Sequence, residues 1–233
     1  MPFARSFTPK LKAILKACLG RDPQAEYWRS RARAFGKRSV LHLGHPEEDF
    51  DRVTEAQKAE IFPFLKAALD GSERIALDYG CGPGRFTRDL AALTRGSAVG
   101  VDLVPEFFDL APKDAAVRFD LIRNGVIPLP EAYVDLVWVC LVLGGIQGRA
   151  LVKTVAEIGR VLRPGGLLFL VENTSELPDA EHWHYRPVSA YQKLFPFAKL
   201  THVHDYYDLS ERISILAGRK GPGGAAEGGS PSL

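Results

Sequence analysis

The chain is poor in cysteine and contains no long apolar run. Its 233 residues include three cysteines, Cys18, Cys81 and Cys140, which are widely spaced and form no Cys-x-x-Cys pair. That pattern argues against a disulfide framework or a structural zinc site and is typical of a reducing compartment. No apolar stretch reaches the length of a membrane span, and the first residues lack the uninterrupted apolar core of a secretory signal. We therefore expect a cytoplasmic protein.

The formal net charge is only +2, but it is unevenly distributed. Residues 1–40 contain ten Lys or Arg and two Asp or Glu, a net charge of +8. A basic arm on an acidic body suits an anionic partner, such as a membrane surface, nucleic acid or a phosphorylated substrate. The alternative is a solvated helix face. Apolar residues at helical spacing predict a basic helix over residues 9–19 within this arm.

From residue 73 onward, short apolar runs alternate with amphipathic stretches. Near-continuous Val, Leu and Ile runs joined by helices are typical of a parallel sheet covered on both faces. A helix, bent or interrupted near Pro63, is predicted to precede the sheet over residues 51–69. The last two apolar segments, residues 199–209 and 211–220, are too close for a crossover helix, so we expect antiparallel pairing. The Gly-, Pro- and Ser-rich tail should be disordered.

The stretch "LDYGCGPGRF", residues 77–86, has three glycines at alternate positions, just after a predicted strand ending in Asp78. Parallel sheets bind ligands at the carboxyl ends of their strands. Glycine lets the backbone approach a ligand closely and adopt positive φ. The dinucleotide fingerprint needs a third glycine where this chain has Arg85, which argues against NAD or FAD.

The pattern Asp-x-Gly-x-Gly-x-Gly instead resembles motif I of the class I S-adenosylmethionine-dependent methyltransferases. Asp102 ends the next strand and Asp120 the one after it. In that family these positions meet the ribose hydroxyls and the adenine amino group. Residues 133–143 look like the family's fourth-strand motif, and "IGRVLRPGGLLFLVEN" like its helix–turn–fifth-strand signature. The resemblance implies S-adenosylmethionine as cofactor, bound by Asp78, Tyr79, Gly80, Gly82, Gly84, Asp102, Leu103, Asp120, Leu121 and, at most through its backbone, Cys140.

The resemblance also implies a fold and a division of the chain. The expected fold is α/β, a Rossmann-like doubly wound sheet of seven strands, mostly parallel with an antiparallel last strand, in three α/β/α layers. The methyltransferase domain would cover residues 51–220. Residues 1–50 would form the basic helix and a lid-like extension, and residues 221–233 the disordered tail.

The segment "DAEHWHYRP" follows the fifth strand, where this fold commonly builds the acceptor side. His182 and His184 alternate there with Trp183, so we interpret the two histidines as candidate catalytic bases; the alternative is an aromatic loop that is only structural. The fourth strand lacks the Asn/Asp-Pro-Pro-aromatic motif of that family's amino-group methylation, which argues against nucleobase-amine methylation of the base-flipping type. Gly144 and Gly145 stand where many relatives have a histidine, and they suggest a larger acceptor pocket.

These observations favour a methyltransferase acting on a small-molecule or glycan-type acceptor, with oxygen as the favoured acceptor atom and no metal. Three alternatives stay open. The first is a catalytically silent, methyltransferase-like binding or scaffold protein. The second is an RNA methyltransferase that uses the basic arm, although no RNA module is recognisable. The third is a nicotinamide-dependent oxidoreductase. The sequence does not indicate an oligomeric state or identify the acceptor.

Overall fold

The structure is a computed structural model that describes residues 23–46 and 49–222. The helix predicted over residues 9–19 and nearly all of the tail predicted over residues 221–233 lie outside these residues. Among the helices described, none is both long and apolar enough to cross a membrane.

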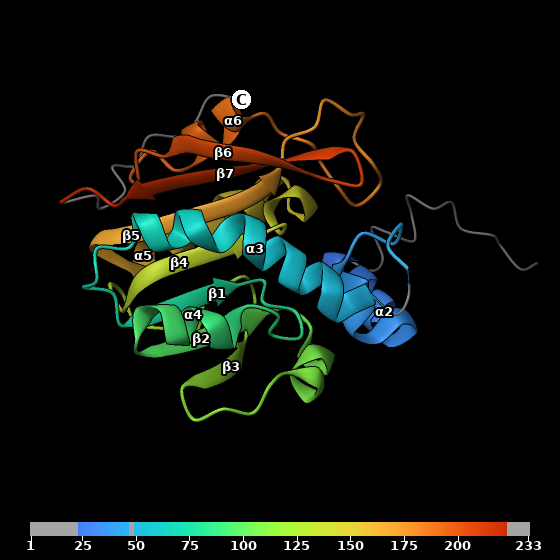
Figure 1. The fold of residues 1–233 in the computed structure, drawn as a ribbon, viewed down its shortest axis with the longest axis horizontal. Coiled ribbons are helices and arrows are strands. Elements are labelled where there is room, and N and C mark those ends of the chain that lie inside the picture. Colours follow the sequence, from blue (N-terminus) through green and yellow to red (C-terminus); the bar gives the residue numbers. More distant parts are fainter. Residues whose placement is uncertain (1–22, 47–48, 223–233) are drawn as a thin grey trace, which may run out of the picture.

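The described residues form a seven-stranded sheet with the strand order β3-β2-β1-β4-β5-β7-β6 (Figure 1). Strands β1 to β5 run parallel, whereas β7 runs antiparallel to both β5 and β6. The strands are β1 (Ile75–Tyr79), β2 (Ser97–Asp102), β3 (Val117–Leu121), β4 (Val134–Cys140), β5 (Leu162–Asn173), β6 (Thr201–Asp208) and β7 (Glu211–Arg219). The predicted doubly wound sheet and its closing antiparallel hairpin are confirmed.

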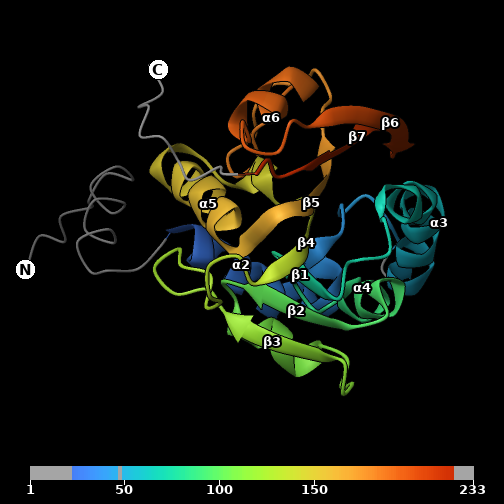
Figure 2. The same cartoon turned by 90° about the vertical axis from the view of Figure 1, so that its left-hand side faces the viewer.

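Helices cover both faces of the sheet (Figure 2). One face packs against α3 (Phe50–Ala68) and α4 (Thr87–Thr94), and the other against α5 (Gly148–Val161) and α6 (Val188–Leu194). Trp138 of β4 is fully buried and stacks on Phe169 of β5 with 5.4 Å between ring centroids. Helix α2 (Pro23–Phe35) and the 3-10 turn η1 (Gly36–Val40) lie near the carboxyl ends of the parallel strands (Figure 1).

Helix α3 continues through Pro63, so the interruption considered at that residue is absent. Pro63 lies on the exposed side of the helix, where the carbonyl freed by its missing N–H can reach water. Ile61 and Leu65 are fully buried on the opposite side. Their packing against the sheet stabilises the helix on both sides of the proline.

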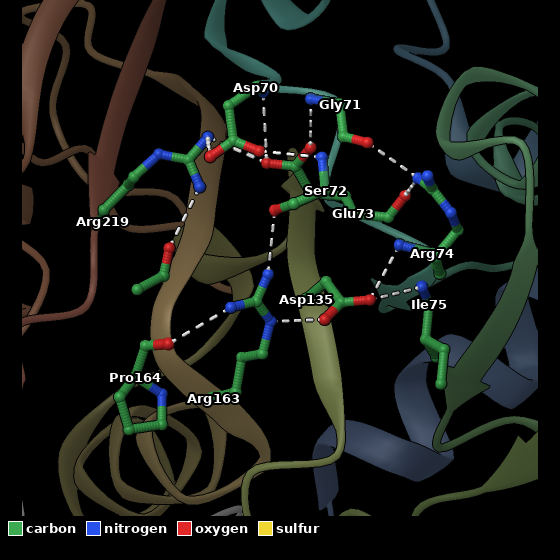
Figure 3. Close-up of polar contacts among 11 residues, drawn as sticks. Asp70, Gly71, Ser72, Glu73, Arg74, Ile75, Asp135, Arg163, Pro164 and Arg219 are labelled. Carbon is green, nitrogen blue, oxygen red and sulfur yellow. Dashed lines mark hydrogen bonds and ion pairs between the residues drawn. The ribbon is translucent and has the colours of Figure 1, made fainter.

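A polar cluster fixes the end of the sheet that lies away from the glycine loop (Figure 3). Asp135 of β4 accepts hydrogen bonds from the backbone N–H groups of Arg74 and Ile75, each at 2.8 Å, and pairs with Arg163 of β5. Burial acts to raise the pKa of the Asp135 carboxyl, but these hydrogen bonds and the Arg163 charge hold it below its usual value. The cluster thus joins β1, β4 and β5 independently of the ligand-binding end.

Candidate active site

The glycine loop lies between β1 and α4 and turns sharply over the end of β2. Gly80 and Gly82 have φ angles of +70° and +53°, which L side chains rarely adopt. A Cβ on Gly80 would also lie 2.6 Å from the Val142 side chain. The backbone N–H of Gly82 donates to Asp102 Oδ2 at 2.9 Å. The glycines are therefore needed to bring the loop backbone against the end of β2.

Asp102 is the last residue of β2, and backbone donors hold its carboxylate on both oxygens. In addition to the Gly82 bond, Oδ1 accepts from the Val104 N–H at 2.9 Å. Burial raises the pKa of Asp102 to about 6, although these two hydrogen bonds act in the opposite direction. An ionised carboxylate can accept about four hydrogen bonds, so acceptor capacity is left for ligand hydroxyls.

Asp78 is the penultimate residue of β1, lies within the same site and is almost completely buried. Its Oδ2 accepts a hydrogen bond from the Thr87 hydroxyl at 2.6 Å. Burial raises the pKa of Asp78 to about 7, with Thr87 acting in the opposite direction and the nearby Asp102 adding to the rise. Near neutral pH this carboxyl group can therefore hold a proton or pair with a ligand cation.

In the sequence Arg85 argues only against a dinucleotide cofactor, but in the structure it lines the site. Its guanidinium donates to Thr54 Oγ1 at 3.1 Å and Gln57 Oε1 at 2.6 Å, and it lies 4.8 Å from the centroid of the Phe86 ring. Burial lowers the pKa of Arg85. Among the described residues Arg85 forms no ion pair. In the sequence, the signal that could have drawn attention to Arg85 is a cation next to three glycines.

A first cavity opens at the carboxyl ends of β1, β2 and β4. Six of the ten residues predicted to bind the cofactor line it, together with Arg85, Phe107 and Ile122. Those six are Asp78, Tyr79, Gly80, Asp102, Leu103 and Cys140. Gly82 does not line the cavity, but its N–H donates to Asp102, which does. A Cβ on Gly84 would meet the Phe119 ring at 2.8 Å, so that glycine permits close packing beneath the loop.

Two of the predicted cofactor residues, Asp120 and Leu121 at the end of β3, do not line this cavity. The Asp120 carboxylate pairs with Arg118 at 3.1 Å, and its side chain is 38% exposed. From the end of the same strand, Ile122 is the residue that reaches the cavity. A contact between Asp120 and an adenine amino group stays a prediction.

A second cavity adjoins the first, and Trp28, Val40 and Leu141 line both. Its walls come from segments far apart in the sequence: α2, η1, the loop after β5 and the β6–β7 hairpin. The other lining residues are Tyr27, Arg31, Ser39, Leu41, His42, Gln57, Asn173, His182, Trp183, Tyr185, Asp208, Glu211 and Ile213. The segment predicted to form a lid-like extension thus contributes residues to both cavities.

The two histidines considered as bases lie in different surroundings. His182 lines the second cavity, and its ring lies on that of Tyr27 with 3.7 Å between centroids. His184 does not line either cavity. Its Nδ1 is 2.8 Å from Asp179 Oδ2, and its backbone N–H donates to the Gly144 carbonyl at 2.7 Å. Of the pair, only His182 can reach a ligand in the second cavity directly.

The sequence suggested that Gly144 enlarges the acceptor pocket, and the structure shows that it does not. The Trp183 side chain covers Gly144. A Cβ on Gly144 would lie 2.3 Å from the Trp183 ring. The turn is held by buried Glu172, which accepts from the backbone N–H groups of Val142 and Leu143 at 3.0 and 2.8 Å. Burial raises the pKa of Glu172 to about 7. The glycine therefore makes room for an indole in the cavity wall.

Comparison with known proteins connects this geometry to one family. Residues 77–170, from β1 to β5, match the family model described as a methyltransferase domain. These residues form a class I methyltransferase domain. The predicted family resemblance, the fold class and the cofactor of that class, S-adenosylmethionine, are thereby confirmed. No group of three or more His, Cys, Asp or Glu side chains in the described part of the chain could hold a metal ion.

Individual relatives match only part of this chain. The secondary metabolism regulator laeA of Coprinopsis cinerea is 32% identical over 149 residues, 58% of this chain and 36% of its own. Alpha N-terminal protein methyltransferase 1 of Drosophila melanogaster is 36% identical over 122 residues, 48% of this chain and 44% of its own. The chain thus spans between a third and a half of the length of these two relatives.

A solved structure shares the fold over most of the chain. Geranyl diphosphate C-methyltransferase from Streptomyces coelicolor, in complex with Mg²⁺, geranyl diphosphate and S-adenosyl-L-homocysteine, superposes with a TM-score of 0.61. The comparison covers 85% of this chain and 98% of that one at 16% sequence identity. At that identity the likeness establishes the fold and leaves the acceptor undetermined.

Proposed function

We propose that this protein transfers a methyl group from S-adenosylmethionine, bound in the first cavity, to a small-molecule acceptor in the second. The observation that carries the proposal is Asp102, which the Gly82 and Val104 N–H groups hold at the end of β2 with acceptor capacity left over. Ribose hydroxyls are donors of the kind that such a carboxylate binds. The fold and the match of residues 77–170 support the same reading.

The remaining groups of the first cavity fit the rest of this cofactor. Arg85 provides a cation without an ion-pair partner in the described structure, which suits the cofactor carboxylate. Asp78 provides a buried carboxyl group that suits the ammonium group. Leu103, Phe107 and Ile122 provide apolar surface for the adenine ring. A pyrophosphate would instead be placed against the carboxylates of Asp78 and Asp102, which disfavours the nicotinamide alternative.

The cofactor, when bound, supplies an electrophilic methyl carbon. The acceptor's lone pair would form the new bond to this carbon while the carbon–sulfur bond breaks and its electron pair stays on sulfur. The residues around the two cavities would align the acceptor and exclude water. Trp28, Val40 and Leu141 border both cavities and would form the passage between them.

His182 is the candidate base of this proposal, because it lines the acceptor cavity and an imidazole accepts protons near neutral pH. An acceptor hydroxyl would lose its proton to His182, whereas a carboxylate acceptor would need no base. The curated relatives do not decide between acceptor atoms: the Drosophila protein is named for protein N-termini, and human TMT1B is a thiol S-methyltransferase. Oxygen therefore stays a prediction from the sequence.

The proposal is tested by incubating the purified protein with methyl-labelled S-adenosylmethionine and small-molecule extract, then identifying labelled products. We expect label in a low-molecular-weight compound with the wild type, and less label with Asp102→Ala when the cofactor concentration is limiting. Cofactor binding without any transfer to extract components would favour the catalytically silent binding protein. Label in RNA alone would favour the RNA methyltransferase.

A further inference from the structure

We propose that the second cavity binds an organic amine in its ammonium form, with Glu211 as the anchoring carboxylate. This inference rests on the proposed function, because it names the substrate class of the acceptor cavity. It also departs from the oxygen acceptor that the sequence favoured. The amine would bind as an ammonium and give one proton to His182, which lines the same cavity, before the freed nitrogen lone pair takes the methyl group and the electrons of the broken bond stay on the cofactor sulfur. The reasons are the two carboxylates at the hairpin end, the aromatic walls of the cavity, and the way its one arginine is bonded.

The two carboxylates come from one cross-strand pair. Asp208 ends β6 and Glu211 begins β7, and the two are direct partners in the ladder. Both line the second cavity, with side chains 17% and 22% exposed. Like charges directly opposite each other destabilise a hairpin. The hairpin turn adds a cost of its own, because Leu209 and Ser210 both have positive φ angles. A site that gathers negative charge in this way is suited to a cation.

The two carboxylates differ in how well they are already paired. Asp208 is 2.8 Å from His45 Nε2 and also accepts from Gln57 at 3.2 Å. Glu211 is bonded to the neutral Asn173 amide and Tyr185 hydroxyl, and its nearest ionisable nitrogen is His42 Nε2 at 3.8 Å. No Lys or Arg of the described chain pairs with either carboxylate. Glu211 is therefore the carboxylate with negative charge left for a ligand.

Aromatic rings supply the rest of the cation site. Tyr27 and Trp28 from α2, and Trp183 and Tyr185 from the loop after β5, line the same cavity as Glu211. The Tyr27 ring is held edge-on to Trp28, with 5.2 Å between centroids and planes at 73°. Ring faces attract cations, and an ammonium group held between aromatic faces and a carboxylate is a recurrent form of recognition. The walls therefore add attraction for the ammonium that an alcohol or carboxylate would lack.

Arg31 is the cation that lines this cavity, and its guanidinium is bonded to the protein. Its Nε donates to the Ser39 carbonyl at 2.6 Å and its Nη2 to the Leu41 carbonyl at 3.0 Å. Its guanidinium carbon also lies 5.6 Å from the centroid of the Trp28 ring. These bonds join α2 to η1 and to Leu41 just after it, so the arginine fixes the cavity wall and two of its nitrogens are engaged by backbone carbonyls.

The test is calorimetric titration of the protein, saturated with S-adenosylhomocysteine, with benzylamine, benzyl alcohol and benzoate near neutral pH. The three probes share one ring, and they differ in charge. We expect benzylamine to bind at least roughly tenfold more tightly than the alcohol and benzoate more weakly still. Glu211→Gln should abolish the preference for the amine while keeping an oxygen for Asn173 and Tyr185. Glu176→Gln, at an exposed carboxylate outside the cavity, is the matched control and should keep it.

Benzyl alcohol or benzoate binding as tightly as benzylamine would overturn this inference, and so would an unchanged preference in Glu211→Gln or no amine binding at all. S-adenosylhomocysteine affinity in the same experiment separates the two proposals. If the wild type binds S-adenosylhomocysteine but shows no preference for the amine, only the substrate class is wrong. If the wild type does not bind S-adenosylhomocysteine, the proposed function is wrong.

Discussion

The backbone N–H of Gly82 donates to Asp102 Oδ2 at 2.9 Å, which fixes the glycine loop to the end of β2. This single bond joins the two sequence features that carry the function, the flexible loop and the carboxylate twenty residues later. Because the loop orients the carboxylate from behind, the opposite side of Asp102 faces the first cavity.

Replacing Arg85 by methionine should weaken binding of S-adenosylhomocysteine at least roughly tenfold, because the carboxylate of that ligand loses its charge-assisted partner. Methylthioadenosine, which lacks the carboxylate and the ammonium group, should bind the variant as it binds the wild type. That second ligand is an internal control for the fold of the site. Calorimetry with both ligands checks the prediction, and equal losses for both would refute a carboxylate-binding role.

Substitution of His182 by alanine should lower kcat roughly a hundredfold or more, as expected when a general base is removed. The measurement uses the acceptor isolated from the extract experiment. His184→Ala is the matched control, because His184 is bonded to Asp179 outside the cavity, and its kcat should stay within a few-fold of the wild type. The affinity for S-adenosylhomocysteine should be unchanged in both. A loss confined to His184→Ala would show that the base has been misassigned.

Gly144→Ala should displace Trp183, because the added Cβ would lie 2.3 Å from the indole ring. Overpacking of this kind typically costs about 1–3 kcal/mol. Gly145→Ala is the neighbouring control, since the nearest atom to its Cβ would be 3.5 Å away. We expect shifted tryptophan emission and a lower free energy of unfolding in the first variant alone. Similar behaviour of the two variants would contradict the packing described.

Asp135→Asn should lower the free energy of unfolding by about 1–3 kcal/mol near neutral pH, because a partly buried charged acceptor is lost. The folded protein holds the pKa of Asp135 below its usual value, so this stabilisation is present above that value. It is lost as the pH falls through the lowered pKa. Denaturant unfolding of the wild type and the variant should therefore converge in acid. Asp109→Asn, at an exposed site, should have little effect at any pH.

The sheet and the first cavity could be predicted because their signals are local in the sequence. Apolar runs mark the strands, and a carboxylate followed by alternate glycines marks the loop at the end of β1. The parallel sheet then brings Asp102 beside the loop, since the carboxyl ends of neighbouring strands share one edge.

The second cavity could not be predicted in this way, because it depends on tertiary packing. Trp28, Trp183 and Glu211 meet there from three distant segments, and no spacing in the sequence relates them. The separation of His182 from His184 likewise depends on Asp179 and Gly144, which hold only His184. The sequence shows Arg85 beside the glycines, but the carboxylate-binding role proposed for it depends on a cavity that only the folded loop forms.

The most direct test of the central claim is calorimetric titration of wild type and Asp102→Ala with S-adenosylhomocysteine. Each charge-assisted bond to the ribose is worth about 1.5–3 kcal/mol, so the variant should lose at least roughly tenfold in affinity. Wild-type affinity should also fall as the pH drops below the Asp102 pKa of about 6, where the carboxylate gains a proton. This part of the fall should be missing in the variant, which keeps only the effect of Asp78, whose pKa is about 7. No binding by the wild type, or equal binding by a folded Asp102→Ala, would contradict the account.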